Sequence, residues 1–370
     1  MFAGAAKPRP GPHAGWALGL VLCLWAVSGL VVAQAAPAAS AVGAAGAVPR
    51  VLTQAALQSP KALQAATLAV TRAGQRLVAV GERGTVQWSD NAGQSWRQAQ
   101  VPVQVTLTAV RFVDARTGWA VGHLGVILKT VDAGQTWALQ LDGVQAAQAV
   151  AAAARSSSDE RVLRAAQRFA EEGPDKPFFD VDFSDAQHGF AVGAYNLAFA
   201  TVDGGKTWTP ALDRLPNPKS FHLYGVRYMG GQVFVVGEQG LLLKSADAGA
   251  TFTALASPYK GSFFGLLAAR SGTLIAYGLR GHALRSADQG AHWDTVQTGV
   301  PVSISAAVEL DGGALALLSQ TGDLLLSRDD GRTVTKIAPT GGPLPASGAA
   351  AADGHLVLAS LRGLRRQHAP

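Results

Sequence analysis

The stretch TVDAGQTW, from Thr130 to Trp137, combines residue types that could form a small catalytic site. A carboxylate, Asp132, stands between two hydroxyl residues, and Trp137 follows at a fixed offset. Such an aspartate could take part in acid–base chemistry. It could instead accept backbone N–H groups inside a tight turn, with Gly134 supplying the conformational freedom that the turn requires. Whether the motif is single or repeated decides between these two interpretations.

The motif occurs six times, which predicts a structural role. Its aspartate position falls at Asn91, Asp132, Asp203, Asp247, Asp288 and Asp329. A tryptophan ends four of the copies, namely Trp96, Trp137, Trp208 and Trp293. The steps between copies are 41, 71, 44, 41 and 41 residues. Six copies of one catalytic site would be unusual, whereas six copies of a turn that fastens a repetitive fold are expected.

A second repeated element keeps the same period. It is an apolar run such as GWAVG, which ends at Gly122, and there are seven copies. Three residues after each run stands a residue that tolerates positive φ. These residues are Gly84, Gly125, Asn196, Gly240, Gly281, Gly322 and Gly363. The pattern predicts a strand buried on both faces and then a hairpin turn, repeated seven times.

A repeat of about 41 residues that holds several short strands is typical of a propeller blade. The sequence therefore predicts an all-β, seven-bladed β-propeller over residues 50–370. Each blade would contain an inner strand, the apolar strand, the Gly turn, a third strand, the Asp motif and an outer strand. The chain ends before the outer strand of the seventh blade. We expect the segment RVLTQAAL, Arg50 to Leu57, to supply that strand and close the ring.

The 71-residue step indicates an insertion between blades 2 and 3, which we place at residues 143–177. Its Ala-rich first half, Ser-rich break and charged second half predict an α-helical hairpin. Ser157 and Glu160 have the spacing of a capping box, and Gly173-Pro174 is a helix stop signal. The hairpin is either a clamp on the ring or a docking element for a partner, and the sequence leaves both roles open.

Residues 1–35 have the features of a signal peptide. Lys7 and Arg9 precede an uncharged apolar run from Trp16 to Ala33, and Ala33-Gln34-Ala35 fits the small-residue cleavage pattern. The alternative is an uncleaved membrane anchor, because the run is about long enough to span a bilayer. Residues 36–49 predict a flexible Ala/Gly/Pro linker. We therefore expect a periplasmic protein, with membrane association if the anchor is retained.

Composition argues against several function classes. The single cysteine, Cys23, lies in the signal segment, so the mature chain has no disulfide, thiol nucleophile or cysteine metal ligand. The formal charge falls from +6 to +4 without Lys7 and Arg9, since residues 1–35 contain no acid. That charge is too small and too dispersed to predict nucleic-acid binding. The histidines lack metal-ligand spacing, so we expect neither a metal nor a cofactor.

Two longer segments carry a family resemblance. They are VRFVDARTGWAVGHLGVILKTVDAGQTW and VDFSDAQHGFAVGAYNLAFATVDGGKTW, which join the Asp motif to an upstream apolar run. The motif is the Asp-box, or bacterial neuraminidase repeat. The combination resembles the photosystem II stability/assembly factor family from about Leu63 to the C-terminus. The resemblance implies a seven-bladed, non-enzymatic propeller on the exported side of a membrane, whose photosynthetic members assist the assembly of a reaction-centre protein.

The helical insertion departs from those photosynthetic members. It is similar to an insertion in non-photosynthetic bacterial relatives, which tend to accompany resistance–nodulation–division exporters. The sequence leaves open whether the host is photosynthetic.

The strand order places the Asp-boxes on one face of the ring, and the Gly turns with the inter-blade loops on the other. Basic and aromatic residues, which often anchor protein interfaces, gather on the second face. The candidate partner-binding residues are Arg83, His123, Tyr195, Glu238, Tyr259, Lys260, Arg280 and Arg362. The inter-blade loops add Lys176, Phe178, Lys219, His222, Tyr224 and Phe263. The resemblance implies an arginine-rich patch, to which Arg83, Arg280 and Arg362 correspond.

We expect a monomer, peripheral to the membrane, that binds an integral membrane protein and assists its assembly or stability. That partner would be reaction-centre-like or a subunit of an exporter. One alternative is a periplasmic accessory protein of a resistance–nodulation–division exporter. Another is a carbohydrate-active hydrolase of the sialidase type. The hydrolase is disfavoured because Arg83, Arg280 and Arg362 occupy equivalent turns in different blades, and no carboxylates are paired by the pattern.

Overall fold

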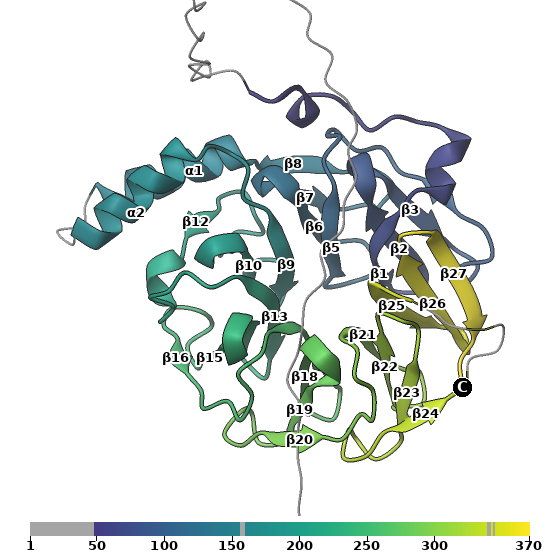
Figure 1. Cartoon of the computed structure of the whole chain (residues 1–370). Helices are drawn as coiled ribbons and strands as arrows, with labels where there is room; N and C mark the ends of the chain where they lie inside the picture. Colours follow the sequence, from purple (N-terminus) through teal and green to yellow (C-terminus); the bar gives the residue numbers. More distant parts are fainter. Residues whose placement is uncertain (1–47, 156–159, 339–341, 343–344) are drawn as a thin grey trace, which may run out of the picture. The chain divides into compact units, whose positions relative to one another are not determined.

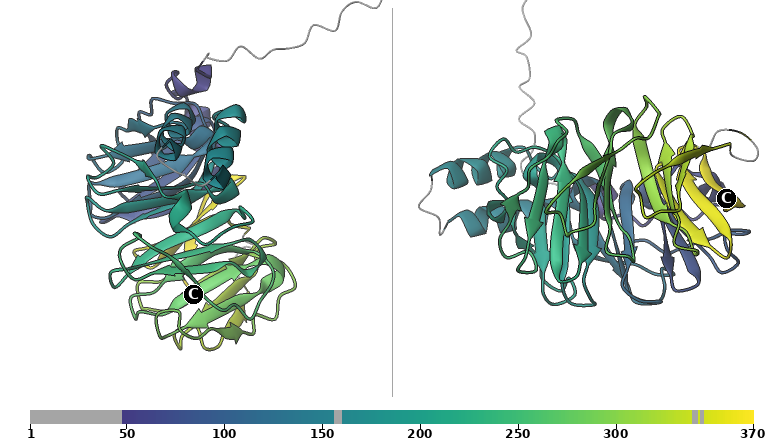
Figure 2. Two further views of the ribbon diagram at one scale, coloured as in Figure 1. Left: turned by 90° about the vertical axis from the view of Figure 1, so that its left-hand side faces the viewer. Right: turned by 90° about the horizontal axis from the view of Figure 1, so that it is seen from below.

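Seven β-sheets stand round a ring within the compact unit Val48–Pro370 (Figure 1). The computed structural model describes residues 48–155, 160–338, 342 and 345–370. Of the described sheets, six have four antiparallel strands and the seventh has three. Figure 2 shows the strands of successive sheets side by side. The prediction of a seven-bladed β-propeller with a helical hairpin between blades 2 and 3 is confirmed.

Each blade follows the chain from the inner to the outer strand. Blades 1 and 2 contain β1 (Thr67–Ala73), β2 (Arg76–Gly81), β3 (Val86–Ser89), β4 (Arg97–Gln98), β5 (Leu107–Phe112), β6 (Gly118–Gly122), β7 (Ile127–Thr130) and β8 (Ala138–Leu141). Blades 3 and 4 contain β9 (Phe178–Phe183), β10 (Gly189–Gly193), β11 (Ala198–Thr201), β12 (Thr209–Pro210), β13 (Leu223–Met229), β14 (Gln232–Gly237), β15 (Leu242–Ser245) and β16 (Thr253–Ala254). Blades 5 to 7 contain β17 (Phe263–Ala268), β18 (Leu274–Gly278), β19 (Ala283–Ser286), β20 (Asp294–Val296), β21 (Ile304–Glu309), β22 (Leu315–Ser319), β23 (Leu324–Ser327), β24 (Thr335–Ile337), β25 (Gly348–Ala352), β26 (His355–Ser360) and β27 (Gly363–His368).

The second strand of each blade is buried on both faces, because the neighbouring blades cover it. Trp119 on β6 is fully buried, and its ring stacks on Phe183 of blade 3 with the ring centroids 3.5 Å apart. The core therefore lies between blades, so each blade depends on its neighbours for burial.

The Gly turns join the second and third strands of the blades. In blade 1, Arg83 and Gly84 have φ values of 52° and 72°, and the Thr85 N–H donates to the Glu82 carbonyl at 2.9 Å. Two consecutive positive φ values make a type I′ turn, whose twist suits a hairpin. All seven predicted turn residues have positive φ, which confirms the turn prediction: Gly84, Gly125, Asn196, Gly240, Gly281, Gly322 and Gly363.

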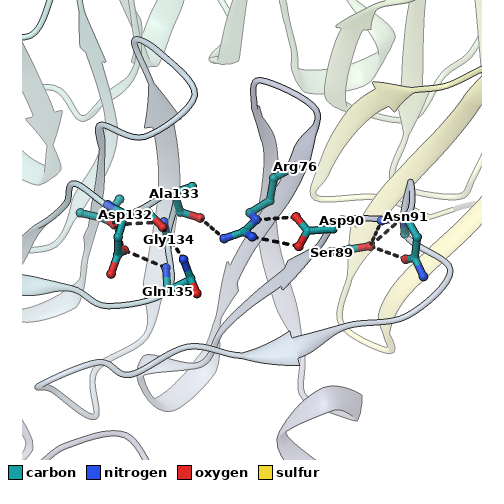
Figure 3. Close-up of polar contacts among 10 residues, drawn as sticks. Arg76, Ser89, Asp90, Asn91, Asp132, Ala133, Gly134 and Gln135 are labelled. Carbon is teal, nitrogen blue, oxygen red and sulfur yellow. Dashed lines mark hydrogen bonds and ion pairs between the residues drawn. The ribbon is translucent and has the colours of Figure 1, made fainter.

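The Asp-boxes connect the third and fourth strands. The Asp132 carboxylate accepts the Thr136 N–H at 3.0 Å, the Thr136 hydroxyl at 2.6 Å and the Thr130 hydroxyl at 2.8 Å (Figure 3 shows part of this turn). The Trp137 indole N–H donates to the Gly134 carbonyl at 3.0 Å, and its ring lies 6.2 Å, edge-on, from Phe112. Although burial opposes it, these hydrogen bonds hold the pKa of Asp132 below its usual value. The turn is closed by its own side chains.

The first copy shows how asparagine replaces the aspartate. The Asn91 side-chain oxygen accepts the Ser89 hydroxyl at 2.8 Å and the Ser95 N–H at 3.0 Å (Figure 3 labels Ser89 and Asn91). Its amide nitrogen donates to the Ser95 hydroxyl at 2.9 Å, so one hydrogen bond is reversed relative to Asp132 and Thr136. Negative charge is therefore not needed to build this turn.

A cationic side chain ties each Asp-box to the preceding blade or connection. Most of the accepting carbonyls belong to a residue with positive φ directly after the Asp position. The donor–acceptor pairs are Arg366–Ala92 (2.8 Å), Arg76–Ala133 (3.3 Å), Lys129–Gly204 (2.8 Å), Arg214–Gly249 (3.3 Å), Lys244–Gln289 (2.8 Å) and Arg285–Asp330 (2.7 Å). We call these contacts the clasps; Figure 3 shows the clasp between Arg76 and Ala133. They link adjacent blades on the face that carries the boxes.

The prediction that Arg50–Leu57 supplies the outer strand of blade 7 was wrong. Arg50–Leu52 forms a short 3-10 helix, η1, the Ala56 N–H donates to Val101 at 2.9 Å, and the Gln104 N–H donates to Val51 at 2.7 Å. The segment therefore lies against the connection between blades 1 and 2. There Leu52 and Ala56 join a buried apolar cluster, which an outer strand at a sheet edge would not provide.

Blades 7 and 1 close the ring through side chains and packing. The Ser347 hydroxyl donates to the Thr67 carbonyl at 3.0 Å, and the Ser360 N–H donates to the Thr67 hydroxyl at 3.1 Å. Arg366 adds its clasp to Ala92. These contacts close the ring without a fourth strand in blade 7, which has three strands within the described chain.

The insertion contains α1 (Gly143–Ala154) and α2 (Glu160–Glu171), as predicted. Asp142 caps α1, since the Gln145 N–H donates to its carboxylate at 2.9 Å and its own N–H donates to the Gln145 side chain at 3.1 Å. The capping box predicted at Ser157 includes residues outside the described part of the chain. Ala146 and Val150 bury one face of α1 in the cluster shared with blade 3.

The predicted signal peptide, residues 1–35, lies outside the described residues, as do residues 36–47 of the linker. Where the structure describes helices, none has the length and apolarity that crossing a membrane would require.

Candidate functional site

The ring has two faces with different content. The Asp-box face carries the six boxes and the clasps. The opposite face, which we call the Gly-turn face, carries the seven Gly turns and the connections between blades, because strands alternate in direction along each blade. All eight candidate partner-binding residues lie in the turns or connections of the Gly-turn face.

Tyr195 belongs to an aromatic cluster that spans blades 3 to 5. Its side chain is 59% exposed, and its ring lies 4.5 Å, edge-on, from His222. Tyr224 lies 6.0 Å from His222 and 5.2 Å from Phe179, and Phe264 lies 5.8 Å from Tyr224. All but Tyr195 are half-buried. A group of rings with accessible edges and faces can bind an apolar or aromatic side chain of a partner.

The backbone around Tyr195 is held in place by this same cluster. Tyr195 has a φ of 53°, and its N–H donates to Nδ1 of His222 at 2.9 Å. That bond fixes the His222 tautomer with the proton on Nε2, because Nδ1 must accept. The positive φ belongs to the repeated type I′ turn, since Arg83, Gln239 and Arg280 have values of 52°, 51° and 56° at the equivalent position, and it presents the Tyr195 ring at the surface.

Glu238 is half-buried and holds the backbone of the connection that carries the cluster. Its carboxylate accepts the His222 N–H at 2.8 Å. Burial and the neighbouring Glu238 carboxylate raise the pKa of the Tyr224 hydroxyl. In blade 1 the equivalent Glu82 accepts the Ala66 N–H at 3.0 Å. Glu238 therefore positions the connection that carries His222 and Tyr224.

Tyr259 and Arg280 extend the site across blade 5. The Tyr259 ring stacks on His282 with centroids 3.9 Å apart, and its hydroxyl donates to the Leu279 carbonyl at 3.0 Å. Burial raises the pKa of Tyr259, against the opposite effect of the Arg280 charge. Lys260 and Arg280 are exposed, so cations stand beside the rings of this region. The combination suits a segment that carries apolar and acidic groups.

The other three candidates lie elsewhere on the Gly-turn face. Arg83 in blade 1 and His123 in blade 2 are exposed at the tips of their turns. Arg362 in blade 7 is exposed and lines a groove of about 890 Å³ with Leu361, Gln320 and other residues of blades 6 and 7. The structure thus groups Tyr195, Glu238, Tyr259, Lys260 and Arg280 on blades 3 to 5, and it does not bring the three arginines into one cluster.

Three predicted loop residues lie inside the molecule. Phe178 and Phe263 are fully buried, and the Lys176 ammonium lies 2.7 Å from Glu172 and 4.4 Å from the Phe169 ring centroid. The residues that reach the Gly-turn face instead are Phe179 and Phe264. The repeat contains the signal for this: Leu107-Thr108, Leu223-Tyr224 and Ile304-Ser305 pair a buried apolar residue with a less buried one at the same blade position. His282, which stacks on Tyr259, was also missed, and no repeated residue pattern in the sequence indicates that it belongs to the site.

The inner strands also hold a buried group of charges that sequence reasoning missed. Asp180 and Asp182 on β9 accept the N–H groups of Val226 at 3.1 Å and Tyr228 at 2.8 Å, so they satisfy the inner edge of β13. Asp180 also pairs with Arg227 at 2.5 Å.

The surroundings of these two carboxyl groups raise their pKa values. Burial raises the pKa of Asp180 to about 7 and that of Asp182 to about 6, against the opposite effect of the Arg111 charge. Nearby, Tyr277 has its pKa raised to about 12 by burial, and its hydroxyl would lie 2.3 Å from a Cβ at position 265, where the chain has Gly265. Asp180 and Asp182 thus join blade 3 to blade 4, and Tyr277 of blade 5 lies close enough for the Asp180 charge to contribute to its raised pKa.

The carboxylates of the Gly turns and of β9 are engaged by backbone N–H groups. Glu82 and Glu238 each hold a backbone N–H of their own blade, and Asp180 and Asp182 hold those of β13. In the described ranges, no three His, Cys, Asp or Glu side chains gather as a metal site would require. These four carboxylates therefore serve as acceptors for backbone N–H groups.

Comparison with known families gives a match over more than half of the chain. The family model described as "Photosynthesis system II assembly factor YCF48" matches residues 88–157 and 169–333. A curated relative, "Photosystem II assembly lipoprotein Ycf48" of Synechococcus sp. (strain CC9902), is 37% identical over 76 residues. That stretch is 20% of this chain and 23% of the relative, so the chain matches about a quarter of the relative's length.

Solved structures share the fold at low sequence identity. "YCF48 bound to D1 peptide" has a TM-score of 0.60 and 14% identity, and the match covers 86% of this chain and 96% of that one. A GH74 enzyme of Niastella koreensis has a TM-score of 0.59 and 13% identity, covering 82% of this chain and 52% of the enzyme. Because one neighbour is an enzyme and the other binds a peptide, the shared fold does not by itself identify a function.

Proposed function

This chain belongs to the family of the photosynthesis system II assembly factor YCF48, and on that basis we propose that it is an exported, non-enzymatic protein that assists the assembly or stability of a membrane protein. It would do so by binding an extended segment of that integral membrane protein on its Gly-turn face. The D1 peptide bound by a YCF48 of the same fold supports this kind of ligand.

The observation that carries the proposal is the cluster on blades 3 to 5. Exposed Tyr195 lies edge-on to His222, and Lys260 and Arg280 stand beside the Tyr259–His282 stack. Aromatic residues and arginine are the usual interface anchors.

Export supports the same function. The signal peptide predicted at residues 1–35 would place the propeller on the outer side of a membrane, and the Synechococcus relative is a lipoprotein. A bound membrane protein would then present a loop or terminus to the ring. The alternative is an exporter-type partner, which is supported by the likeness of the α1–α2 insertion to that of relatives that accompany exporters. The hairpin packs beside blade 3 and adds a surface there.

The test is recovery of a membrane partner. The mature chain with an affinity tag would be incubated with detergent-solubilised membranes of its host, and captured proteins would be identified by mass spectrometry. We expect one integral membrane protein to be enriched, and the double variant Tyr195→Ala/Arg280→Glu to lose at least nine-tenths of it. Lys206→Glu, an exposed charge reversal on the Asp-box face, is the matched control. Equal capture by the double variant would exclude this face as the binding surface.

A further inference from the structure

Blade 7 differs from the other described blades in one respect. Among the described residues, no fourth strand pairs with its third strand, β27, whereas the third strand of every other blade pairs with an outer strand. β27 is also longer, with six residues instead of the four residues of β3, β7, β11, β15, β19 and β23. The strand pairs with β26 along its whole length, so its other edge is directed away from the sheet (Figure 1, yellow).

An open strand edge presents backbone donors and acceptors in a row, and an extended chain can pair with it. We propose that β27 accepts an extended, acidic segment of the membrane-protein partner as the missing fourth strand of blade 7. This inference rests on the proposed function, because it assigns a second contact to the same partner.

The charge of β27 determines which occupant fits. The stretch from His355 to Pro370 contains Arg362, Arg365, Arg366 and two histidines, and no acid. The net positive charge of this stretch favours an acidic segment beside it. A second copy of the chain would pair β27 with β27 and bring arginines together, which is unfavourable. The chain's own residues 36–47 contain no acid and are mostly Ala and Gly.

The groove described above adds a second, independent feature at the same place. It is lined by Leu361, Arg362, Leu364 and Arg365 on the blade 7 side, and by Ser305, Gln320 and Ala346 on the blade 6 side. It opens beside the first residues of β27, and Leu361 is 77% exposed there. A segment that pairs with β27 can therefore place an apolar side chain in the groove, which gives the strand a fixed register.

The 3-10 helix η2 approaches the first residue of β27. η2 (Pro60–Gln64) lies next to Gly363, where a Cβ would be 3.5 Å from the carbonyls of Gln64 and Ala65. Arg366, further along β27, directs its guanidinium to Ala92 in blade 1. Pairing at the outer edge leaves this clasp intact, because it uses backbone groups and not the Arg366 side chain.

Two short peptides provide the probes. One is an acetylated, amidated octapeptide that alternates valine with glutamate, and the other replaces each glutamate by lysine. Binding of fluorescein-labelled peptide to the mature chain would be followed by fluorescence anisotropy, and amide hydrogen exchange of residues 363–368 would be measured with and without peptide. We expect the glutamate peptide to bind at least tenfold more tightly than the lysine peptide and to slow exchange in β27.

Backbone methylation tests strand pairing without changing the protein. Two versions of the glutamate peptide, N-methylated at alternate amides, block one edge each. Pairing with β27 predicts that one version loses binding and the other retains it. Equal binding by both versions, or by the lysine peptide, would overturn the proposal, as would binding that leaves exchange of residues 363–368 unchanged.

A protein variant separates this inference from the proposed function. Arg362→Glu/Arg365→Glu should weaken the glutamate peptide at least tenfold, while Lys206→Glu should not. If Tyr195→Ala/Arg280→Glu loses the membrane partner but the peptide fails to protect β27, the inference fails alone. If that variant retains the partner, the aromatic cluster is excluded as the binding surface. If the unaltered chain captures no integral membrane protein, the proposed function fails, whatever the peptide does.

Discussion

The Asp-box face and the Gly-turn face are built from the same seven repeats but differ in how variable they are. Each box repeats one set of hydrogen bonds, from Ser89–Asn91 in blade 1 to Ser327–Asp329 in blade 6. The Gly turns repeat only their backbone, and the residue at their first positive-φ position changes from Arg83 to Leu124, Tyr195, Gln239 and Arg280. Repetition marks the face that holds the ring together, and variation marks the face available for binding.

The comparison is tested most strongly by removing a box tryptophan. Trp137→Ala should lower the free energy of unfolding by about 3–5 kcal/mol, because the side chain is buried between blades 1 and 2. Tyr195→Ala on the opposite face should change it by less than about 0.5 kcal/mol, since its ring is largely exposed. Urea unfolding monitored by circular dichroism measures both. Similar losses in the two variants would contradict the division between the faces.

A smaller effect is expected from the box carboxylate. Asp132→Ala removes the acceptor for Thr136 and Thr130 and should cost about 1–2 kcal/mol. Asp132→Asn should cost less than half of that, because Asn91 already serves in blade 1 with one hydrogen bond reversed. The same urea titration distinguishes them. If the asparagine variant is as unstable as the alanine variant, charge and not hydrogen bonding fastens the box.

The repeat also shows what sequence alone can and cannot predict here. The boxes and Gly turns were predictable residue by residue, because local hydrogen bonds and positive φ require particular residue types. The way in which the ring closes was not predictable in this manner. Leu52 and Ala56 are buried between blades 1 and 2, and this burial outweighed strand pairing of residues 50–57 with blade 7. The outward turn of Phe179 and Phe264 follows from the repeat alignment, whereas the Tyr259–His282 stack depends on tertiary contacts between a connection and a turn.

The clasps should matter less than the boxes themselves. Lys129→Met keeps most of the apolar stem of the side chain but removes its bond to the Gly204 carbonyl, and should cost about 1 kcal/mol. Arg366→Met should cost a similar amount and should also increase hydrogen exchange in β1 and β27, since it joins the first and last blades. Lys206→Met, which changes an exposed residue of the blade 3 box, serves as the control. A control that loses as much stability as Lys129→Met would show that the clasps are ordinary surface contacts.

The pH dependence of stability separates the boxes from the inner strands. The pKa values of Asp203, Asp247 and Asp329 are lowered to about 2, mainly by hydrogen bonds within the boxes. These groups therefore contribute stability above about pH 4, which is lost as the pH falls toward 2. Asp180 and Asp182 have raised pKa values of about 7 and 6, so their contribution is present below about pH 4 and is lost as the pH rises to 7.

These opposite signs predict a maximum in Tm between about pH 4 and 5. Thermal unfolding from pH 3 to 8 would measure it, and Asp182→Asn should flatten the slope between pH 5 and 7, because one of the two raised groups is removed. A Tm that increases from pH 5 to 8 would contradict the assignment of the buried carboxyl groups.

The smallest effects concern residues that adopt positive φ on the two faces. Arg83 and Ala133 have φ values of 52° and 61°, which glycine adopts without steric cost. Arg83→Gly and Ala133→Gly should each change the free energy of unfolding by no more than about 0.5 kcal/mol, because relief of strain and the greater flexibility of the unfolded chain offset each other. Capture of the membrane partner should differ: if Arg83 contributes to the arginine-bearing face, Arg83→Gly reduces it, and Ala133→Gly leaves it unchanged. Equal capture by the two variants would remove Arg83 from the binding surface.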